Sequence, residues 1–493
     1  MKRFIEEAKK LIRINSVSSH GNEEIANYVA ALMQDRSMKI HMQTVTHSLE
    51  DVSKRQFNVF GILGDSLVDR KIRKGLLLLT HLDTVGPGLL DNWGETGRDP
   101  FNATLKDGRI YGLGAADVKL DFLCKLHAVE KFREKKLRAP IYLVGTCGEE
   151  VGMFGARYLI QSFALNPQAV LVGEPTELRI VAAHKGLNIF KVSLEFQMIE
   201  RDARGFNRKI HFYAFGKSAH SAYPHLGNNA LLEALTFLKN ARNAGFEMRF
   251  TDVQGGDTVN KVPDQASFEF YLDSHQFEDF KRFFREAIRH QEKEKSFRVE
   301  LGGVGDTGVK FLPEEIFECL VQVVDVFRQL DQSLAERRDE GFDPPVSTMN
   351  IGRIHQRLGG VDLYFDLRLL PDISPADIEK KIQEEVVKVA EKYQQMNITA
   401  SRQRMNPGFQ MSEDSTFVHS AKKAAEAVGL DPMIAKKATS TEASQYFQAG
   451  YPALVFGAGL SQGNSHGPNE WNSLEQLQKA ILFYEKMIED ICL

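Results

Sequence analysis

Three short, almost wholly apolar runs mark the first part of this chain, and a segment with helical spacing separates each run from the next. The runs are Leu76–Thr80, Ile141–Thr146 and Ala169–Val172. A strand that is apolar on both sides has to be covered on both faces, as in a parallel sheet between helices. Helices predicted at Lys119–Glu134 and Phe154–Phe163 would supply that cover. The sequence therefore predicts an α/β fold built on a mainly parallel sheet.

The pattern changes after Glu174. Apolar and polar residues then alternate in part, which is typical of strands with one buried face. The strand-like segments are Ile180–Leu194, Ile210–Phe215, Ser267–Leu272 and Val361–Leu370, and the helical ones are Asn229–Asn243, Gln276–Glu294, Pro313–Arg338 and Pro375–Tyr393. Strands with helices gathered on one face indicate an α+β domain. After about Pro407 the alternation of helices and strands returns.

We therefore predict one α/β domain built from both ends of the chain, with an α+β domain inserted between them. The parts are residues 1–180, 181–404 and 405–493, with an extra segment at about 274–347 inside the insert. Within the insert, Gly255–Asp273 and Thr348–Arg368 both resemble a turn followed by a strand, so a duplicated hairpin is one interpretation.

Composition excludes several classes of protein. The 493 residues carry a formal net charge of −4, so no basic excess is available for nucleic acid or an anionic membrane. The four cysteines form no CxxC pair, and Met1–Ser16 lacks the apolar core of a signal peptide. Every apolar run is shorter than the ~20 residues that a membrane span needs. We expect a soluble cytoplasmic protein.

Seven polar side chains follow predicted strand ends or glycine-rich turns. They are His81, Asp83, Asp117, Glu149, Glu150, Glu174 and His466. The carboxyl ends of strands in an open α/β sheet meet in one crevice, so residues far apart in the sequence can come together there. Imidazoles and carboxylates are common ligands of divalent metals. The set therefore indicates a site for two metal ions.

Each of these residues also has a simpler interpretation when it is taken alone. A local hydrogen bond to Asp83 would satisfy His81, and Asp117 would serve as a helix cap. Glu149 and Glu150 would face solvent in a loop. Against this, adjacent carboxylates after a buried strand repel each other unless a cation or a proton lies between them. The metal-site interpretation depends on the whole set meeting.

Several motifs around these residues resemble those of the dinuclear-zinc aminoacylase and carboxypeptidase family. They are HLDTV, RDPF followed by GRIYGLGAADVK, CGEE followed by GARYL, GEPTE, AHKG, GKSAHSAYP, STEA and SHGPNEW. Within that family the acetylornithine deacetylases are most similar, followed by the succinyl-diaminopimelate desuccinylases. The resemblance covers nearly the whole chain, and its motifs are specific in combination.

The resemblance implies a role for each candidate residue. The implied ligands are His81 and Glu174 for one zinc ion, Glu150 and His466 for the other, and Asp117 as the bridge. The implied general base is Glu149, with Asp83 as the partner of His81. The insert looks like the family's dimerisation lid, in which His220 would donate to the reacting carbonyl oxygen and Asn260 would approach the site. Cobalt or manganese could replace zinc.

Three more residues are candidates for holding a substrate carboxylate. The backbone N–H groups of Gly457 and Gly459 could face it, and Arg353 could either neutralise it or form a surface ion pair. The insert has longer links than is typical of the acetylornithine group, which leaves the substrate open.

The leading hypothesis is a metal-dependent hydrolase that removes the acyl group from an N-acylated amino acid, in the manner of acetylornithine deacetylase in arginine biosynthesis. Within this class the alternatives are a succinyl-diaminopimelate desuccinylase and a dipeptidase or carboxypeptidase acting on short peptides. From another class, a non-catalytic metal-binding interaction protein stays open. The resemblance also implies a homodimer formed through the lid.

Overall fold

The computed structural model describes residues 1–46, 55–65, 67–68, 71–72, 74–162, 166–201, 206, 208–290, 296–304 and 309–493. They form two compact units. Unit 1 consists of Met1–His184 and Asn406–Leu493, and unit 2 of Lys185–Met405. The predicted helix ends at Phe163 and Glu294 lie outside the described residues.

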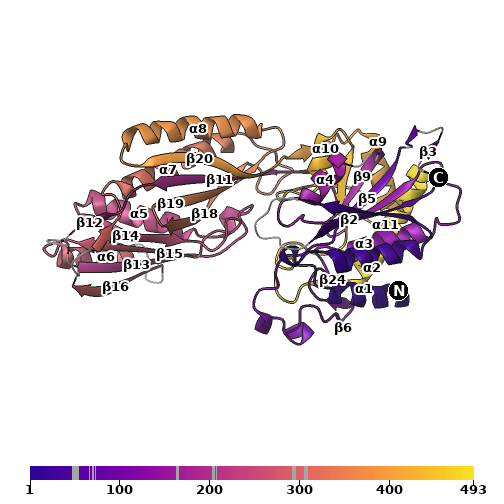
Figure 1. Ribbon diagram of the computed structural model, residues 1–493, viewed down its shortest axis with the longest axis horizontal. Coiled ribbons are helices and arrows are strands. Elements are labelled where there is room, and N and C mark those ends of the chain that lie inside the picture. The colour runs from indigo at the N-terminus through magenta and orange to yellow at the C-terminus, as the bar shows by residue number, and fades with distance from the viewer. Residues whose placement is uncertain are drawn as a thin grey trace. The chain divides into compact units, whose positions relative to one another are not determined.

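A nine-stranded sheet forms the centre of unit 1 (Figure 1). Its path runs through β1 (Lys39–Val45), β2 (Gln56–Leu63), β8 (Ile141–Thr146), β5 (Gly75–His81), β9 (Pro167–Gly173), β23 (Ala453–Phe456), β10 (Ile180–His184) and β21 (Phe409–Gln410), with β22 (Ile434–Lys437) beside β10. Neighbours among β8, β5, β9 and β23 are parallel. The outer strands of the path pair antiparallel. The predicted α/β class is confirmed, and the parallel part lies at the centre because those strands are apolar on both sides.

Helices cover both faces of this sheet. α1 (Lys2–Arg13), α3 (Lys119–Glu130) and α11 (Leu474–Cys492) lie along one face, and α4 (Phe154–Ser162) and α10 (Ala443–Gln448) along the other (Figure 1). The unit also contains α2 (Glu23–Gln34), α9 (Thr416–Ala427), the hairpin of β3 (Leu67–Val68) and β4 (Lys71–Ile72), and a small sheet of β6 (Thr104–Lys106), β7 (Arg109–Tyr111) and β24 (Trp471–Ser473). None of the helices in the described ranges has the length and apolar character needed to cross a bilayer.

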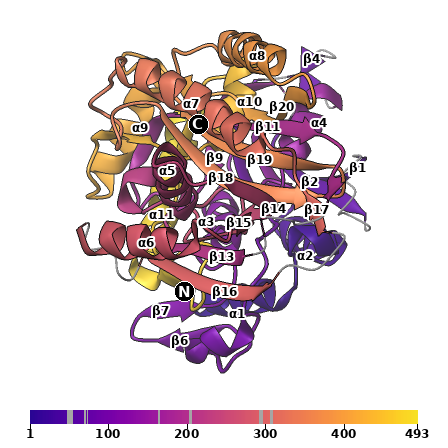
Figure 2. The ribbon, with the colours of Figure 1, turned by 90° about the vertical axis from the view of Figure 1, so that its left-hand side faces the viewer.

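Unit 2 contains an eight-stranded sheet with four helices over one face (Figure 2). The strand order is β16 (Phe297–Val304), β13 (Arg208–Phe215), β15 (Gln265–Leu272), β14 (Met248–Gly255), β18 (Thr348–Arg357), β19 (Gly360–Leu369), β11 (Gly186–Glu195) and β20 (Asn397–Asn406). The helices are α5 (Ala230–Asn243), α6 (Phe277–His290), α7 (Ile316–Ala335) and α8 (Pro375–Lys392), and β12 (Ile199–Arg201) pairs with β17 (Val309–Phe311). The predicted α+β character of the insert is confirmed, and the segment 274–347 contributes two of these helices.

Aromatic side chains hold the helices of unit 2 against its sheet. Phe237 of α5 stacks on Phe212 of β13 with ring centroids 5.0 Å apart, and Phe327 of α7 stacks on Phe365 of β19 at 3.5 Å. These rings belong to one continuous apolar cluster that spans the sheet. Phenylalanine is abundant in the chain because this layer uses it as the main filler between helices and strands.

A charged group lies under α1 in unit 1. Glu7 is 8% exposed, and its carboxylate accepts hydrogen bonds from Arg36 at 2.9 and 3.0 Å and from His127 at 2.7 Å. Arg36 is fully buried, so the cost of desolvating its charge is offset by its carboxylate partners. Burial alone would raise the pKa of Glu7, but hydrogen bonds and charges from His127 and Arg36 lower it to about 2.

The variant Glu7→Gln is expected to have a free energy of unfolding at pH 7 that is lower by roughly 3 kcal/mol, because the substitution removes a buried counter-charge of Arg36. The native pKa of Glu7 lies below that of the unfolded chain, so the stabilisation is present above about pH 4.5 and is lost as the pH falls towards 2. Urea unfolding at pH 7 and at pH 3 measures this. Glu6→Gln, on the exposed face of the same helix, is the control. If the variant lost the same free energy of unfolding at pH 7 and at pH 3, the ionic role of Glu7 would be contradicted.

Candidate metal centre

The ends of three neighbouring parallel strands carry candidate metal ligands. His81 is the last residue of β5, Glu174 directly follows β9, and Glu149 and Glu150 lie just beyond the end of β8. These strands are adjacent in the order β8-β5-β9, so their carboxyl ends meet at one edge of the sheet. This is the position at which open α/β sheets bind ligands.

The small sheet brings two further candidates to this edge from opposite ends of the sequence. β24 pairs antiparallel with β7, so that Trp471 lies opposite Tyr111. The turn after β7 leads to Asp117, and the loop before β24 carries His466. Backbone pairing therefore brings together Asp117 and His466, which are 349 positions apart in the sequence, and sequence spacing alone does not reveal this contact.

The Asp117 carboxylate lies between two imidazoles. Its Oδ1 is 3.2 Å from Nε2 of His81, and its Oδ2 is 3.2 Å from Nε2 of His466. Glu150 Oε1 lies 3.1 Å from the same nitrogen of His466. Each carboxylate oxygen of Asp117 thus faces a different histidine, which is the arrangement expected of a group that bridges two cations.

Two sets of side chains place three ligand atoms within 4.8 Å of one another. One set is His81, Glu149 and Glu150, and the other is Asp117, Glu150 and His466. Among the residues that the structure describes, Glu174 belongs to neither set. Its Oε2 instead accepts a hydrogen bond from the ammonium of the half-buried Lys437 at 3.1 Å.

Asp83 differs from its expected role. Nδ1 of His81 is 3.1 Å from the backbone oxygen of Asp83 and 3.7 Å from its carboxylate. The carbonyl can only accept, so Nδ1 carries a proton, and Nε2 is the nitrogen that faces the Asp117 carboxylate and would bind a metal after losing its own proton. The carboxylate accepts hydrogen bonds from Ser18 at 2.7 Å and from the backbone N–H groups of Glu149 at 3.1 Å and Glu150 at 3.3 Å. Asp83 therefore orients the histidine through its backbone and the two glutamates through its side chain.

The charges of the cluster favour bound cations. Four carboxylates gather here, namely Asp117, Glu149, Glu150 and Glu174, and Lys437 supplies one positive charge beside them. The charge of Glu150 and the hydrogen bonds that His466 donates to Asp117 and Glu150 raise the pKa of His466 to about 12 against the effect of burial. Histidine nitrogens that lie among carboxylate oxygens form a donor set that fits divalent metal ions.

Two buried glutamates beside the centre, Glu470 and Glu442, are not among the residues predicted from the sequence. Glu470 accepts hydrogen bonds from the backbone N–H groups of Gly114 at 3.2 Å, Ala116 at 2.7 Å and Asp117 at 2.9 Å, and burial raises its pKa to about 7. Glu442 accepts a hydrogen bond from Thr146 at 2.9 Å, and burial raises its pKa to about 8. Both lie within the motifs SHGPNEW and STEA, which were the signals available in the sequence.

The variant Glu470→Ala is expected to weaken metal binding by about 10- to 100-fold, as removal of a group that orients a metal ligand generally does. Three backbone N–H groups would lose their acceptor, and the turn that carries Asp117 would lose its anchor. Metal competition with a chromogenic chelator measures the affinity. Glu475→Ala, at an exposed position in the first turn of α11, is the control. An unchanged metal affinity with lowered thermal stability would assign Glu470 a purely structural role.

The expected role of Gly457 and Gly459 is wrong. The N–H of Gly457 donates to Thr176 Oγ1 at 3.1 Å, and the N–H of Gly459 donates to Gln476 Oε1 at 2.9 Å. Neither N–H is therefore available to a substrate carboxylate. Gly457 is needed for close packing, because a Cβ there would lie 2.5 Å from the backbone oxygen of Glu174.

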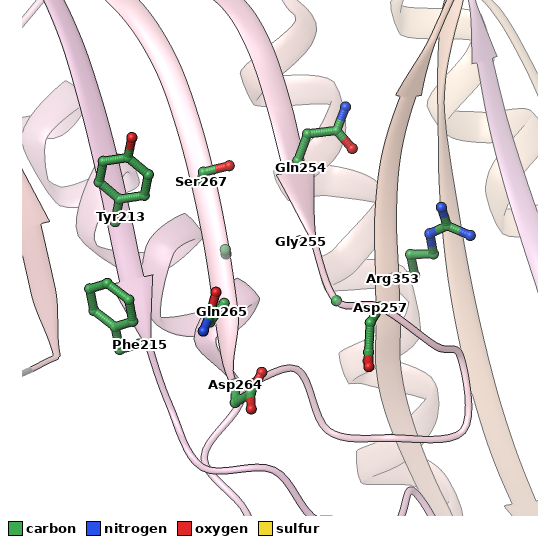
Figure 3. A pocket seen from close by; sticks show the side chains of 11 residues that line it. Tyr213, Phe215, Gln254, Gly255, Asp257, Asp264, Gln265, Ser267 and Arg353 are labelled. Atoms are coloured by element: carbon green, nitrogen blue, oxygen red, sulfur yellow. The ribbon is translucent and has the colours of Figure 1, made fainter. Parts of the chain in front are cut away.

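The remaining candidates lie in unit 2. The backbone N–H of Ala222 donates to Nδ1 of His220 at 3.0 Å, so the proton of the neutral ring is on Nε2. The backbone oxygen of Asn260 accepts from the N–H of Ser221 at 3.0 Å, which keeps the two segments side by side. Arg353 of β18 lies beside a hollow of about 480 Å³ in the sheet, together with Tyr213 and other side chains of β13, β14 and β15 (Figure 3).

At this sheet edge the carboxylate of Asp117 lies between two groups of imidazole and carboxylate ligands. This arrangement is typical of metal-dependent hydrolases. The chain belongs to peptidase family M20/M25/M40, whose sequence profile matches residues 77–490. It is therefore an enzyme of this family, which decides against a non-catalytic interaction protein.

Known proteins agree with this assignment. The acetylornithine deacetylase of Erwinia tasmaniensis is 30% identical over 292 residues, which is 55% of this chain and 67% of that protein. The aminoacylhistidine dipeptidase of Vibrio alginolyticus has a similar fold, with a TM-score of 0.67 and 18% identity over 99% of this chain and 96% of that one. An M20 family metallo-carboxypeptidase of Sulfolobus solfataricus has a TM-score of 0.60 and 19% identity over 99% of both chains.

Proposed function

We propose that this enzyme hydrolyses the amide bond of an N-acylated amino acid and that N-acetylornithine is its substrate. The observation that carries the proposal is the Asp117 carboxylate, whose two oxygens each face a histidine, with Glu149 and Glu150 beside it. The relative named acetylornithine deacetylase supports the choice of substrate, at a modest 30% identity. A role in arginine biosynthesis depends on this substrate.

The proposed cofactor is a pair of divalent metal ions, with zinc first and cobalt second. One ion would bind between His81 and Glu174 and the other between Glu150 and His466, with Asp117 as the shared ligand. Nitrogen and oxygen donors of this kind suit zinc. The ion pair of Glu174 with Lys437 leaves its second carboxylate oxygen for a metal, so Glu174 would bind through one oxygen.

When bound, such metals polarise an amide carbonyl and acidify a water molecule. The residues of the chain supply the proton transfer. Glu149 is 8% exposed at the edge of the cluster, and its backbone is held by Asp83, so its carboxylate is placed to take a proton and to return it to the leaving amine. The neutral ring of His220 carries its proton on Nε2, and this N–H can donate to a developing oxyanion.

A panel of substrates tests the proposal. The zinc-loaded protein is assayed against acetylornithine, succinyl-diaminopimelate and a set of dipeptides that includes aminoacylhistidines. Release of acetate from acetylornithine, at a kcat/KM at least tenfold above that for the other compounds, is the expected result. Preference for a dipeptide would make the enzyme a peptidase and would remove the proposed role in arginine biosynthesis. No turnover of any amide by protein that holds two metal ions would contradict the proposal as a whole.

A further inference from the structure

A buried ion pair lies in unit 1 beside the strand ends that carry the metal ligands. It joins Asp121, in the first turn of α3, to Lys125 one turn further on, and Nζ of Lys125 is 2.7 Å from Oδ2 of Asp121. Asp121 is 2% exposed and Lys125 is fully buried. Replacing a buried ion pair by apolar side chains of similar volume is often neutral or stabilising, so stability alone does not explain these charges.

The pair holds β5 at the two residues that precede His81. The ammonium of Lys125 donates to the backbone oxygen of Leu79 at 2.5 Å and to Oγ1 of Thr80 at 2.9 Å. The hydroxyl of Thr80 donates in turn to Oδ2 of Asp121 at 2.8 Å. Together with the ion pair, these contacts use all three N–H groups of the ammonium. The end of β5 is therefore fixed by side chains of α3 as well as by its neighbouring strands.

The pair also lies against the end of β9, directly before Glu174. A Cβ at Gly173 would overlap Oδ2 of Asp121 and would lie 2.6 Å from Nζ of Lys125. A residue without a side chain is needed here, because the two charged groups occupy the space that a Cβ would take. The strand end that carries Glu174 is thus shaped around the ion pair.

A third strand end is linked to the pair through Tyr484 of α11. The hydroxyl of Tyr484 donates to Oδ1 of Asp121 and lies 2.9 Å from the backbone oxygen of Phe456, the last residue of β23. A Cβ at Gly457, the next residue, would lie 3.1 Å from Oδ1 of Asp121. Asp121 therefore connects the ends of three adjacent strands, β5, β9 and β23, to the helices α3 and α11.

The other candidate ligands have anchors of their own. The N–H of Glu150 donates to Asp83 at 3.3 Å, and the N–H of Asp117 donates to Glu470 at 2.9 Å. His466 lies in the loop before β24, which belongs to the small sheet. The contacts of the ion pair thus fall on one half of the candidate metal centre.

We propose that Asp121 and Lys125 are positioning residues, which set the distance between His81 and Glu174 and with it the affinity for the ion that these two ligands share. The proposal rests on the proposed function for the assignment of ligands to two ions. Without the pair, the ends of β5 and β9 no longer share a support. The ion between them then binds more weakly, and the other ion keeps its affinity.

The double variant Asp121→Asn/Lys125→Met tests the proposal, because it removes both charges together and nearly keeps the shape of both side chains. Cobalt chloride is titrated into the metal-free full chain and followed by visible absorption. The variant Glu174→Gln supplies the spectrum of the other ion alone, so that the two sites are measured separately. We expect the affinity of the His81–Glu174 site to fall about 10-fold and that of the other site to stay the same.

A second buried pair provides the control for stability. Glu7→Gln/Arg36→Met removes charges that contact the later part of α3 through His127. This control should lower the midpoint of thermal unfolding and leave both cobalt affinities unchanged. Equal weakening of both sites in Asp121→Asn/Lys125→Met would mean that the ion pair only stabilises the fold, and two unchanged affinities would mean that it does not position the ligands. Either result overturns the proposal.

Thr80→Val decides the question if the double variant does not fold. The substitution keeps the shape of the side chain and removes the hydroxyl that joins β5 to the ion pair. The same site should weaken, by a smaller factor, and a Thr80→Val protein with both affinities of the parent would overturn the proposal. Turnover enters neither titration, so a wrong substrate would contradict the proposed function alone. A parent protein that binds no cobalt would contradict both.

Discussion

The variant Glu149→Gln is expected to lower kcat by about 10²- to 10⁴-fold while the protein keeps its metal ions, since a general base contributes a factor of this size. The amide has nearly the shape of the carboxylate, but it cannot take a proton from water. The backbone hydrogen bond to Asp83 does not involve the replaced group, so the loop should keep its position. Steady-state kinetics with the best substrate of the panel, together with metal content by mass spectrometry, gives both quantities.

The metal content decides between two roles for Glu149. Its carboxylate lies in one of the two sets of close ligand atoms, so a metal ligand is the competing assignment. Loss of one metal ion from Glu149→Gln would make it a ligand, and full metal content with activity within threefold of the parent enzyme would leave it without either role. Glu177→Gln is the matched control, because Glu177 is an exposed carboxylate in the motif GEPTE of Glu174.

The variant Asp117→Ala is expected to lose more than about 100-fold in metal affinity, which exceeds the effect of losing a group that merely orients a ligand. Its carboxylate is the group that faces both histidines, so its removal acts on both ions together. Titration calorimetry of the metal-free protein should show two weakened sites. Activity at saturating zinc should be lost as well, because the pair of ions would no longer be held at a fixed separation.

The contrasting result is a lower metal affinity at only one of the two metal sites. It would mean that Asp117 binds one ion and only hydrogen-bonds the histidine at the other. Asp107→Asn is the control, because Asp107 is an exposed turn residue between β6 and β7 and asparagine accepts its positive φ of 50°. Unchanged metal binding in Asp107→Asn would show that the effect belongs to the carboxylate of Asp117 and not to the stability of the small sheet.

The central fold was predictable because its strands are apolar on both sides. β8 spans Ile141–Thr146 as predicted, and β5 and β9 extend their predicted runs by one or two residues at each end. The edge elements were not predictable in this way. β7 and β24 are three residues each, too short for any periodicity, yet their pairing brings Asp117 and His466 to the same place.

The site was predictable as a set of residue types, and less so as a set of contacts. Motif order identified His81, Asp117, Glu149, Glu150 and His466, which the structure brings together. It did not identify Lys437, whose ammonium meets Glu174 because β22 joins the sheet beside β10. The two glycines after β23 suggested that the N–H groups of Gly457 and Gly459 could face a substrate carboxylate, whereas local side chains accept both of them.

The sequence by itself determined the alternation of apolar strands and helices, and with it which carboxylates and imidazoles lie at strand ends. The reason is that a strand buried on both faces needs an apolar residue at nearly every position of a short run. The tertiary structure alone decided which oxygen meets which nitrogen and which strands lie side by side in the two large sheets. Those facts depend on hydrogen bonds between strands far apart in the chain, and a ladder of backbone N–H and C=O groups is the same for every residue type and leaves no trace in the sequence.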